Sequence, residues 1–461
     1  MSILDDIAKS INREFNLLFD REIRIGVTGL SGGGKSTFIT SLVNLISAFG
    51  ENGTAELVPR FRSYNDFGFV YGGLAGQRDL KVPSFPYQKA LSSLYAREPS
   101  WPEATSGVSE IRLELRYKNQ DLISFSETKS LYIDIWDYPG EWLMDLMLLD
   151  LNYEEFSERI RKRVKDLDEV SLKNEWVSFG SSLHGDDAFD QVKAEKLVQL
   201  YTDWLLECKS RGFAMVVPGR LVLPGDLKGA PILQFVPWIW DHPANVSSTS
   251  LYSVFSERYE NYREQVVRKF YTDCFSKLDR QIILVDCLKA LMGGRETFMD
   301  INDSFEVLLE HFSYGSSSFL SRLFYPKIDK VIFAATKADE ITLSQHENML
   351  NLLCSMVSKA ARKIRADCSN CEFMLLSSIR ASKCLYAEHE GEQVQVLSTD
   401  YPDEKPFFPG SVPARWSREG MEFFQKYFSL RELRPPLLSM DERLPNINMD
   451  LMLEYLLKDK L

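Results

Sequence analysis

The stretch from Gly29 to Thr37, G-L-S-G-G-G-K-S-T, constrains the fold more than any other part of the chain. It fits the pattern G-x-x-x-x-G-K-[ST], follows a β-branched run at residues 23–28 and precedes apolar residues at helical spacing in residues 38–46. Glycines let the backbone turn its N–H groups inward around an oxyanion, and the first amides of a following helix strengthen that site. The sequence therefore predicts a phosphate-binding loop between a strand and a helix.

The polar residues of this loop have distinct expected roles. Lys35 would face the outer phosphates and neutralise charge in the transition state, and the Ser36 hydroxyl would be a magnesium ligand. The other expected nucleotide contacts are Ser31, Gly32, Gly33, Gly34 and Thr37. The alternative is a plain glycine-rich turn, which the Lys-Ser pair and the flanking strand and helix disfavour.

Composition narrows the possible partners. With 461 residues the chain is long enough for two or three domains, and its net charge of −12 argues against nucleic acid as a main partner. No apolar run is long enough to span a bilayer and no signal peptide is recognisable, so we expect a cytoplasmic protein. An amphipathic segment at residues 3–18 has a polar face of mixed charge, which favours packing on the protein and leaves peripheral membrane association open.

A second motif follows the strand predicted at residues 131–137. Asp137 begins the sequence D-Y-P-G, which fits the D-x-x-G of GTPases. An aspartate at the end of a strand can hold magnesium through water, and the Gly140 amide can contact the γ-phosphate. Glu141 occupies the place where Ras-like proteins have the glutamine that orients the attacking water. A carboxylate there can accept a proton but also repels the phosphate, so its role in catalysis or in holding magnesium stays open.

Residues 51–101, rich in Gly, Pro and aromatic residues, are predicted to form a long ordered loop before a strand at 111–117. Thr105 lies just ahead of that strand. In nucleotide switches a threonine at this place reaches magnesium and the γ-phosphate, so Thr105 is a candidate metal ligand and catalytic residue. The alternative is an ordinary turn residue.

A third motif indicates which base is bound. After a strand predicted at residues 330–335, Thr336 begins the sequence T-K-A-D, which fits [NT]-K-x-D. Asp339 can accept hydrogen bonds from the N1–H and the 2-amino group of guanine, a pair of donors that adenine lacks. The stem of Lys337 would lie over the base.

Two further strands are predicted at residues 281–286 and 372–376. The second leads into Ser378 and Ile379, whose place resembles the loop that offers a backbone amide to guanine O6 in GTPases. This match is looser than the preceding motifs.

The motifs divide the chain into three parts. Residues 1–142 and 280–461 would form the two halves of one nucleotide-binding core, and residues 143–279 a mostly helical insertion. Helices are expected within residues 152–177, 189–211 and 250–278, and closing helices at 420–428 and 449–457. Charged residues in the irregular segment 217–231, such as Arg220, would either line a cleft or lie in a solvated loop.

Over nearly its full length the chain resembles the YcjX-like P-loop proteins, a bacterial stress-associated group linked to the phage-shock regulon. The residues that carry the resemblance are 29–37, 136–142, 218–231 and 336–339, of which the proline-rich segment 218–231 is the most specific. The resemblance implies a P-loop core with an inserted domain. Because this group is also described as ATPase-like, it leaves the base open.

These observations together predict an α/β fold, a GTPase-like P-loop core with a mostly parallel sheet interrupted by a helical insertion. The expected activity is magnesium-dependent hydrolysis of GTP to GDP and phosphate as a conformational switch, with an unidentified effector or activator protein as partner. Two alternatives stay open: an ATPase or ATP-dependent phosphotransferase, and a scaffold that binds nucleotide with little turnover.

Overall fold

The computed structural model describes residues 21–30, 33–104, 107–120, 127–167, 173–243, 246–312, 328–367, 371–389 and 391–461. Three predicted features lie outside these residues: the amphipathic segment 3–18, the loop residues Ser31 and Gly32, and Thr105.

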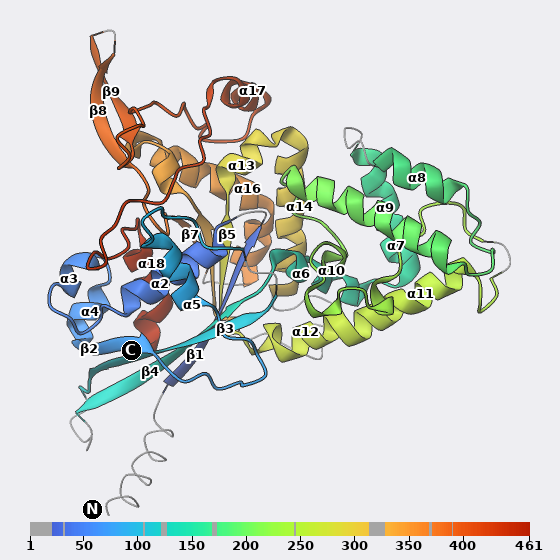
Figure 1. Cartoon of the computed structure of the whole chain (residues 1–461), viewed down its shortest axis with the longest axis horizontal. Helices are drawn as coiled ribbons and strands as arrows, with labels where there is room; N and C mark the ends of the chain where they lie inside the picture. Colours follow the sequence, from blue (N-terminus) through green and yellow to red (C-terminus); the bar gives the residue numbers. More distant parts are fainter. Residues whose placement is uncertain are drawn as a thin grey trace, which may run out of the picture.

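Within the described residues, one seven-stranded sheet has the order β2-β3-β4-β1-β5-β6-β7 (Figure 1). Strands β4, β1, β5, β6 and β7 are parallel, whereas β3 pairs antiparallel with β4 and β2 antiparallel with β3. The bounds are β1 Arg21–Leu30, β2 Phe69–Leu74, β3 Ser109–Lys118, β4 Thr128–Asp137, β5 Arg280–Val285, β6 Lys330–Ala335 and β7 Cys371–Leu375. The predicted α/β fold with a mostly parallel sheet is confirmed.

Helices cover both faces of the sheet because its strands are apolar on both sides. One face packs on α2 (Lys35–Ile46), α5 (Tyr87–Leu94) and α18 (Met449–Leu457), with Ile23, Phe38 and Met452 in one buried cluster. The other face packs on α13 (Cys287–Met292), α14 (Gly294–Phe312) and α16 (His346–Asp367). The closing helix α17 (Arg418–Tyr427) contacts α13 and α14.

The predicted helical insertion lies between β4 and β5 and extends away from the sheet (Figure 1). Its centre is a stack of buried aromatic rings, in which the Trp176 ring centroid lies 4.7 Å from that of Tyr201 and 5.2 Å from that of Trp204. The insertion and one face of the sheet share a single hydrophobic cluster. The helices are α6 Gly140–Met144, α7 Tyr153–Asp166, α8 Lys173–Ser181, α9 Gln191–Ser210, α10 Gly219–Val222, α11 Leu251–Tyr262 and α12 Arg268–Asp273. The domain boundaries at 142/143 and 279/280 stay predictions.

The prediction of a long loop over residues 51–101 is wrong. This region contains α3 (Thr54–Leu57), α4 (Arg62–Phe67), strand β2 and α5. Its aromatic residues hold it together, since the rings of Phe49, Phe61, Tyr64 and Phe69 pack on one another at centroid distances of 5.1 to 5.7 Å. Tertiary packing thus overrides the local glycine and proline signals. A hairpin that was not predicted from the sequence consists of β8 (Lys383–His389) and β9 (Glu392–Ser398) and projects from the body (Figure 1).

A buried charge connects the sheet to the last helical turn of the chain. The Arg280 side chain at the start of β5 is 0% exposed, and its guanidinium lies 3.2 Å from Asp329 and 2.5 Å from Asp459. Asp459 also pairs with Lys330. Burial raises the pKa of the Asp459 carboxyl, but hydrogen bonds from Arg280 and Lys330 outweigh it and lower this pKa to about 2.

We expect Asp459→Asn to lower the free energy of unfolding at pH 7, because the buried guanidinium of Arg280 loses one of its two compensating carboxylates. The loss should be only about 1 to 2 kcal/mol, because water partly screens the charge of Asp459. The folded pKa of Asp459 lies below its unfolded value of about 3.9, so the stabilisation is present above that value and is lost as the pH falls toward about 2. Urea unfolding between pH 7 and pH 3 measures this difference.

The control is Glu103→Gln, which breaks a pair with Lys89 in which both side chains are largely exposed. It should change the stability by less than about 0.5 kcal/mol. Equal effects of the two substitutions would contradict a stabilising role for the Arg280 cluster.

Candidate functional site

The predicted motifs meet at one edge of the sheet. Because β4, β1, β5, β6 and β7 are parallel, their carboxyl ends lie at the same edge, where ligands bind in open α/β sheets. Gly33 follows β1, Asp137 ends β4, Thr336 follows β6 and Ser377 follows β7. The described parts of all these motifs are therefore brought together.

The glycine-rich loop closes tightly on the first turn of α2. Gly34 has a φ of +74° and is the residue before this helix, which starts at Lys35. A Cβ added to Gly33 would lie 2.9 Å from the Leu284 carbonyl oxygen, and one added to Gly29 would lie 3.1 Å from Lys35 Cγ. The stem of Lys35 therefore folds back across the start of the loop, as a phosphate-binding lysine requires.

The D-x-x-G turn packs directly on this loop. Asp137 is 1% exposed and lies opposite Val27 of β1. A Cβ added to Gly140 would lie only 2.5 Å from the Gly29 carbonyl oxygen, so this position accepts glycine alone without a shift of the backbone. The Gly140 backbone is thus placed beside the loop that precedes Lys35.

The expected magnesium ligands are chemically suited to that ion. Ser36, on the first turn of α2, is 8% exposed, and Asp137 ends the strand beside β1. Both offer oxygen atoms, and magnesium at nucleotide sites typically takes few protein ligands because it keeps waters and binds phosphate oxygens. Among the described residues no group of three or more His, Cys, Asp and Glu side chains is arranged to hold a metal by itself.

Glu141 is held by the insertion. Its carboxylate, 9% exposed, lies 2.9 Å from the ammonium of Lys209 in the last turn of α9. Lys209 could not be identified from the sequence, because no motif joins it to Glu141 and only the fold brings the two together.

The proline-rich segment packs on the turn after Gly140. A Cβ added to Gly219 would lie 2.3 Å from the Glu141 carbonyl oxygen, and the Gly219 N–H donates to Asp145 Oδ1 at 2.7 Å. The Tyr262 hydroxyl donates to the other carboxylate oxygen of Asp145 at 2.5 Å. Burial raises the pKa of Asp145 to about 7, although these hydrogen bonds and nearby Arg220 oppose the shift.

Arg220 does not lie in a solvated loop. Its side chain is 12% exposed, and its guanidinium carbon lies 3.2 Å from the centroid of the Trp142 ring. It also pairs with Asp226 at 2.9 Å. The expectation that a loop residue here is solvated is wrong for Arg220, because the ring of Trp142 provides a cation–π surface that the sequence pattern does not reveal.

The residues expected to bind the base lie together at the ends of β6 and β7. Asp339 is 7% exposed and its Oδ2 accepts a hydrogen bond from the Ala381 N–H at 2.8 Å. Burial raises the pKa of the Asp339 carboxyl, against hydrogen bonds from Ser377 and the Ala381 amide. Ser378 and Ile379 lie in the same buried loop, and their contact with guanine stays a prediction.

Lys337 has acidic partners that the sequence analysis missed. It has a φ of +63°, and its ammonium lies 3.0 Å from Asp286 and 3.4 Å from Glu340. Burial lowers the pKa of Lys337, but the two carboxylates raise it above its usual value. Burial also raises the pKa of Glu340 to about 8, against the charge of Lys337. These contacts fix the lysine stem at the edge of the sheet.

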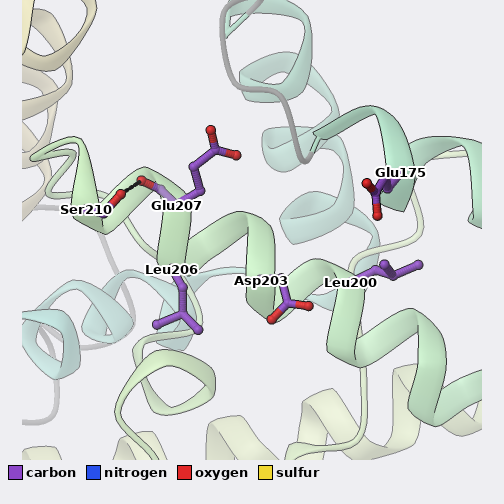
Figure 2. A pocket seen from close by; sticks show the side chains of 6 residues that line it. All are labelled: Glu175, Leu200, Asp203, Leu206, Glu207 and Ser210. Carbon is purple, nitrogen blue, oxygen red and sulfur yellow. Dashed lines mark hydrogen bonds between the residues drawn. The ribbon is translucent and has the colours of Figure 1, made fainter.

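Two cavities lie elsewhere, and none of the predicted site residues lines them. One, of about 410 Å³, lies between α8 and α9 and is lined by three carboxylates, two leucines and Ser210 (Figure 2). The other, of about 260 Å³, lies on the sheet beside Arg24, Asp134 and Trp136. In the part of the chain that the structure describes, no helix is both long and apolar enough to cross a membrane.

Comparison with known proteins agrees with this arrangement of motifs. The sequence profile of the YcjX-like family, DUF463, matches residues 23–461. The chain belongs to the YcjX-like family. It is 36% identical over 475 aligned residues to the "Ras-like GTPase YcjX" of Escherichia coli K12, with 98% of this chain and 100% of the relative covered. It is 33% identical over 467 residues to a protein of the same name from Shewanella oneidensis MR-1, with 96% and 95% covered. The resemblance inferred from the sequence motifs is thereby confirmed.

The contact between Gly219 and Glu141 generates a prediction. We expect Gly219→Ala to lower the free energy of unfolding by about 1 to 3 kcal/mol, because the new Cβ would overlap the Glu141 carbonyl oxygen. This oxygen belongs to the backbone and cannot move aside as the end of a flexible side chain could. The control is Gly76→Ala, where an added Cβ meets nothing within 4 Å. Urea unfolding of both variants measures the difference, and a Gly219→Ala protein as stable as Gly76→Ala would contradict this packing.

Proposed function

We propose that this YcjX-like protein binds GTP with magnesium and hydrolyses it to GDP and phosphate, and that the change acts as a conformational switch. The observation that supports the proposal most is the placement of Asp339 at the same sheet edge as Lys35, with its carboxylate buried and fixed by the Ala381 amide. The name of the two relatives, Ras-like GTPase, agrees with the GTP part of this proposal.

Guanine is favoured over adenine by the chemistry of Asp339. A carboxylate accepts hydrogen bonds, and guanine presents two adjacent donors, N1–H and the 2-amino group. Adenine presents an unprotonated N1, which a carboxylate would repel. Because Asp339 is buried, an unsatisfied donor or acceptor there costs about 1 to 3 kcal/mol, which is enough to discriminate between the bases.

Each phosphate-facing residue has one task in the proposed reaction. The Lys35 ammonium neutralises charge on the outer phosphates, and Ser36 and Asp137 would hold magnesium, which would supply further positive charge to the phosphates. The Gly140 amide contacts the γ-phosphate, and Glu141 orients the attacking water. Loss of the γ-phosphate would release Gly140, and the backbone contact of Glu141 with Gly219 would transmit that change to the insertion.

We further propose that the protein acts in the cytoplasm, in a stress response, through a protein effector. This proposal rests on the resemblance to the stress-associated family and on the negative net charge, which disfavours nucleic acid. The chemistry of the site does not depend on it.

Lys35→Ala tests the phosphate site. We expect it to weaken binding of triphosphate and to lower the single-turnover rate of phosphate release at least about a hundredfold, because the cation facing the β- and γ-oxygens is removed. Lys89→Ala, at an exposed helix position, is the control. A folded Lys35→Ala protein with an unchanged rate would show that the loop does not bind the reacting phosphates.

Asp339→Asn tests the base. The NH₂ group of the new asparagine would face the 2-amino group of guanine, and both are hydrogen-bond donors. The binding free energy of GTP should therefore weaken by about 2 to 4 kcal/mol, which lowers the affinity roughly thirtyfold to nearly a thousandfold. Xanthine carries a carbonyl at C2, so the variant should instead gain affinity for XTP. Competition binding with GTP, XTP and ATP measures both effects.

The control for this experiment is Asp403→Asn, at a largely exposed residue paired with Arg434. It should leave all three affinities unchanged. If Asp339→Asn also leaves GTP affinity unchanged and gains nothing for XTP, Asp339 does not select the base and the ATPase alternative is favoured.

A further inference from the structure

We propose that Lys209 of the insertion is a positioning residue for hydrolysis: it holds and neutralises the Glu141 carboxylate, so that the Glu141–Lys209 pair replaces the neutral glutamine of Ras-like proteins. The inference rests on the proposed function, because it assumes that a γ-phosphate lies beside Gly140. It assigns a task in the nucleotide site to a residue of α9.

The geometry of the pair supports this assignment. The Glu141 carboxylate is 9% exposed and the Lys209 ammonium lies 2.9 Å from it, with 29% of the lysine side chain exposed. A buried carboxylate needs a compensating cation, and the low effective dielectric strengthens the attraction. Glu141 directly follows Gly140, whose backbone touches Gly29 at the start of the glycine-rich loop, so the backbone of Glu141 lies next to the proposed phosphate site.

Other nearby charges have different partners. The Arg220 guanidinium is held by the Trp142 ring and Asp226, and Asp145 accepts hydrogen bonds from Gly219 and Tyr262. Among the ion pairs of the described residues, the cation found at Glu141 is Lys209.

Electrostatics explains why a glutamate at this position needs a lysine. A triphosphate carries several negative charges, and a lone carboxylate a few Å from the γ-phosphate would disfavour both binding and the transition state. A glutamine avoids that cost because it is neutral. The pair of Glu141 and Lys209 is also neutral overall, yet it keeps a carboxylate oxygen that can accept a hydrogen bond from the attacking water.

The lysine comes from the last turn of α9, whose neighbouring residues Glu207 and Ser210 line the 410 Å³ cavity (Figure 2). The end of α9 therefore has this cavity on one side and the turn that holds Glu141, after β4, on the other. Hydrolysis would then depend on the position of the insertion.

The test is a double-mutant cycle on the full-length protein. Lys209→Ala, Glu141→Gln and the double variant are compared in single-turnover GTP hydrolysis and in affinity for GDP and a non-hydrolysable GTP analogue. We expect Lys209→Ala to slow hydrolysis about tenfold or more and to lower the affinity for the GTP analogue about three- to tenfold, because the uncompensated charge of Glu141 would repel the γ-phosphate. The affinity for GDP, which has no γ-phosphate, should stay unchanged. Lys209→Arg should restore most of both losses.

The glutamine background separates this role from a structural one. In Glu141→Gln the lysine has no charge to neutralise, so adding Lys209→Ala should change neither the rate nor the ratio of analogue to GDP affinity. Lys193→Ala, at an exposed position of the same helix, is the control and should resemble the wild type. Thermal unfolding verifies that each variant is folded.

Three results would overturn the inference: Lys209→Ala hydrolyses as fast as the wild type, it hydrolyses faster, or it slows hydrolysis equally in the glutamine background. Each is distinct from a failure of the proposed function, in which the wild type itself would not discriminate GTP from ATP or would not turn over. If the wild type binds GTP without turnover, the ratio of analogue to GDP affinity still decides whether Lys209 neutralises Glu141.

Discussion

Two contacts between backbone atoms, both made possible by glycines, connect the glycine-rich loop to the insertion. Gly140 lies against the Gly29 carbonyl, and Gly219 lies against the carbonyl of Glu141, the next residue along the chain from Gly140. Backbone contacts of this kind have no flexible side chain that could absorb a displacement. A shift of the turn after β4 therefore has to move the proline-rich segment, or separate from it.

Charged side chains near the carboxyl ends of the parallel strands are held in place by partners within the protein. Lys337 lies between Asp286 and Glu340, Asp339 is held by the Ala381 amide, and Glu141 is held by Lys209. Each of these groups has a partner within the protein, which restricts the rotation of its side chain. This restriction would suit the proposed selection of guanine, because an Asp339 carboxylate held by the Ala381 amide is less free to rotate away from a wrong base.

The sequence predicts the strands and motifs well but not the contacts between distant segments. Apolar runs and glycine patterns are local, so β1, β4 and β6 and the residues that follow them could be located from the chain alone. The aromatic packing that orders residues 51–101, and the pairing of Lys209 with Glu141, depend on segments far apart in sequence. The roles of all the predicted site residues stay predictions, and Ser31, Gly32 and Thr105 also lie outside the described residues.

The two carboxylate partners of the buried Arg280 guanidinium are synthesised at different times. Its partner Asp459 is added to the chain 179 residues later, which at typical rates of synthesis takes about 10 to 35 seconds. Until then β5, between β1 and β6, carries a cation without one of its carboxylates. Nascent chains therefore pass through a period in which the Arg280 guanidinium can pair with Asp329 but not yet with Asp459, and the central sheet lacks the stabilisation that this second pair provides.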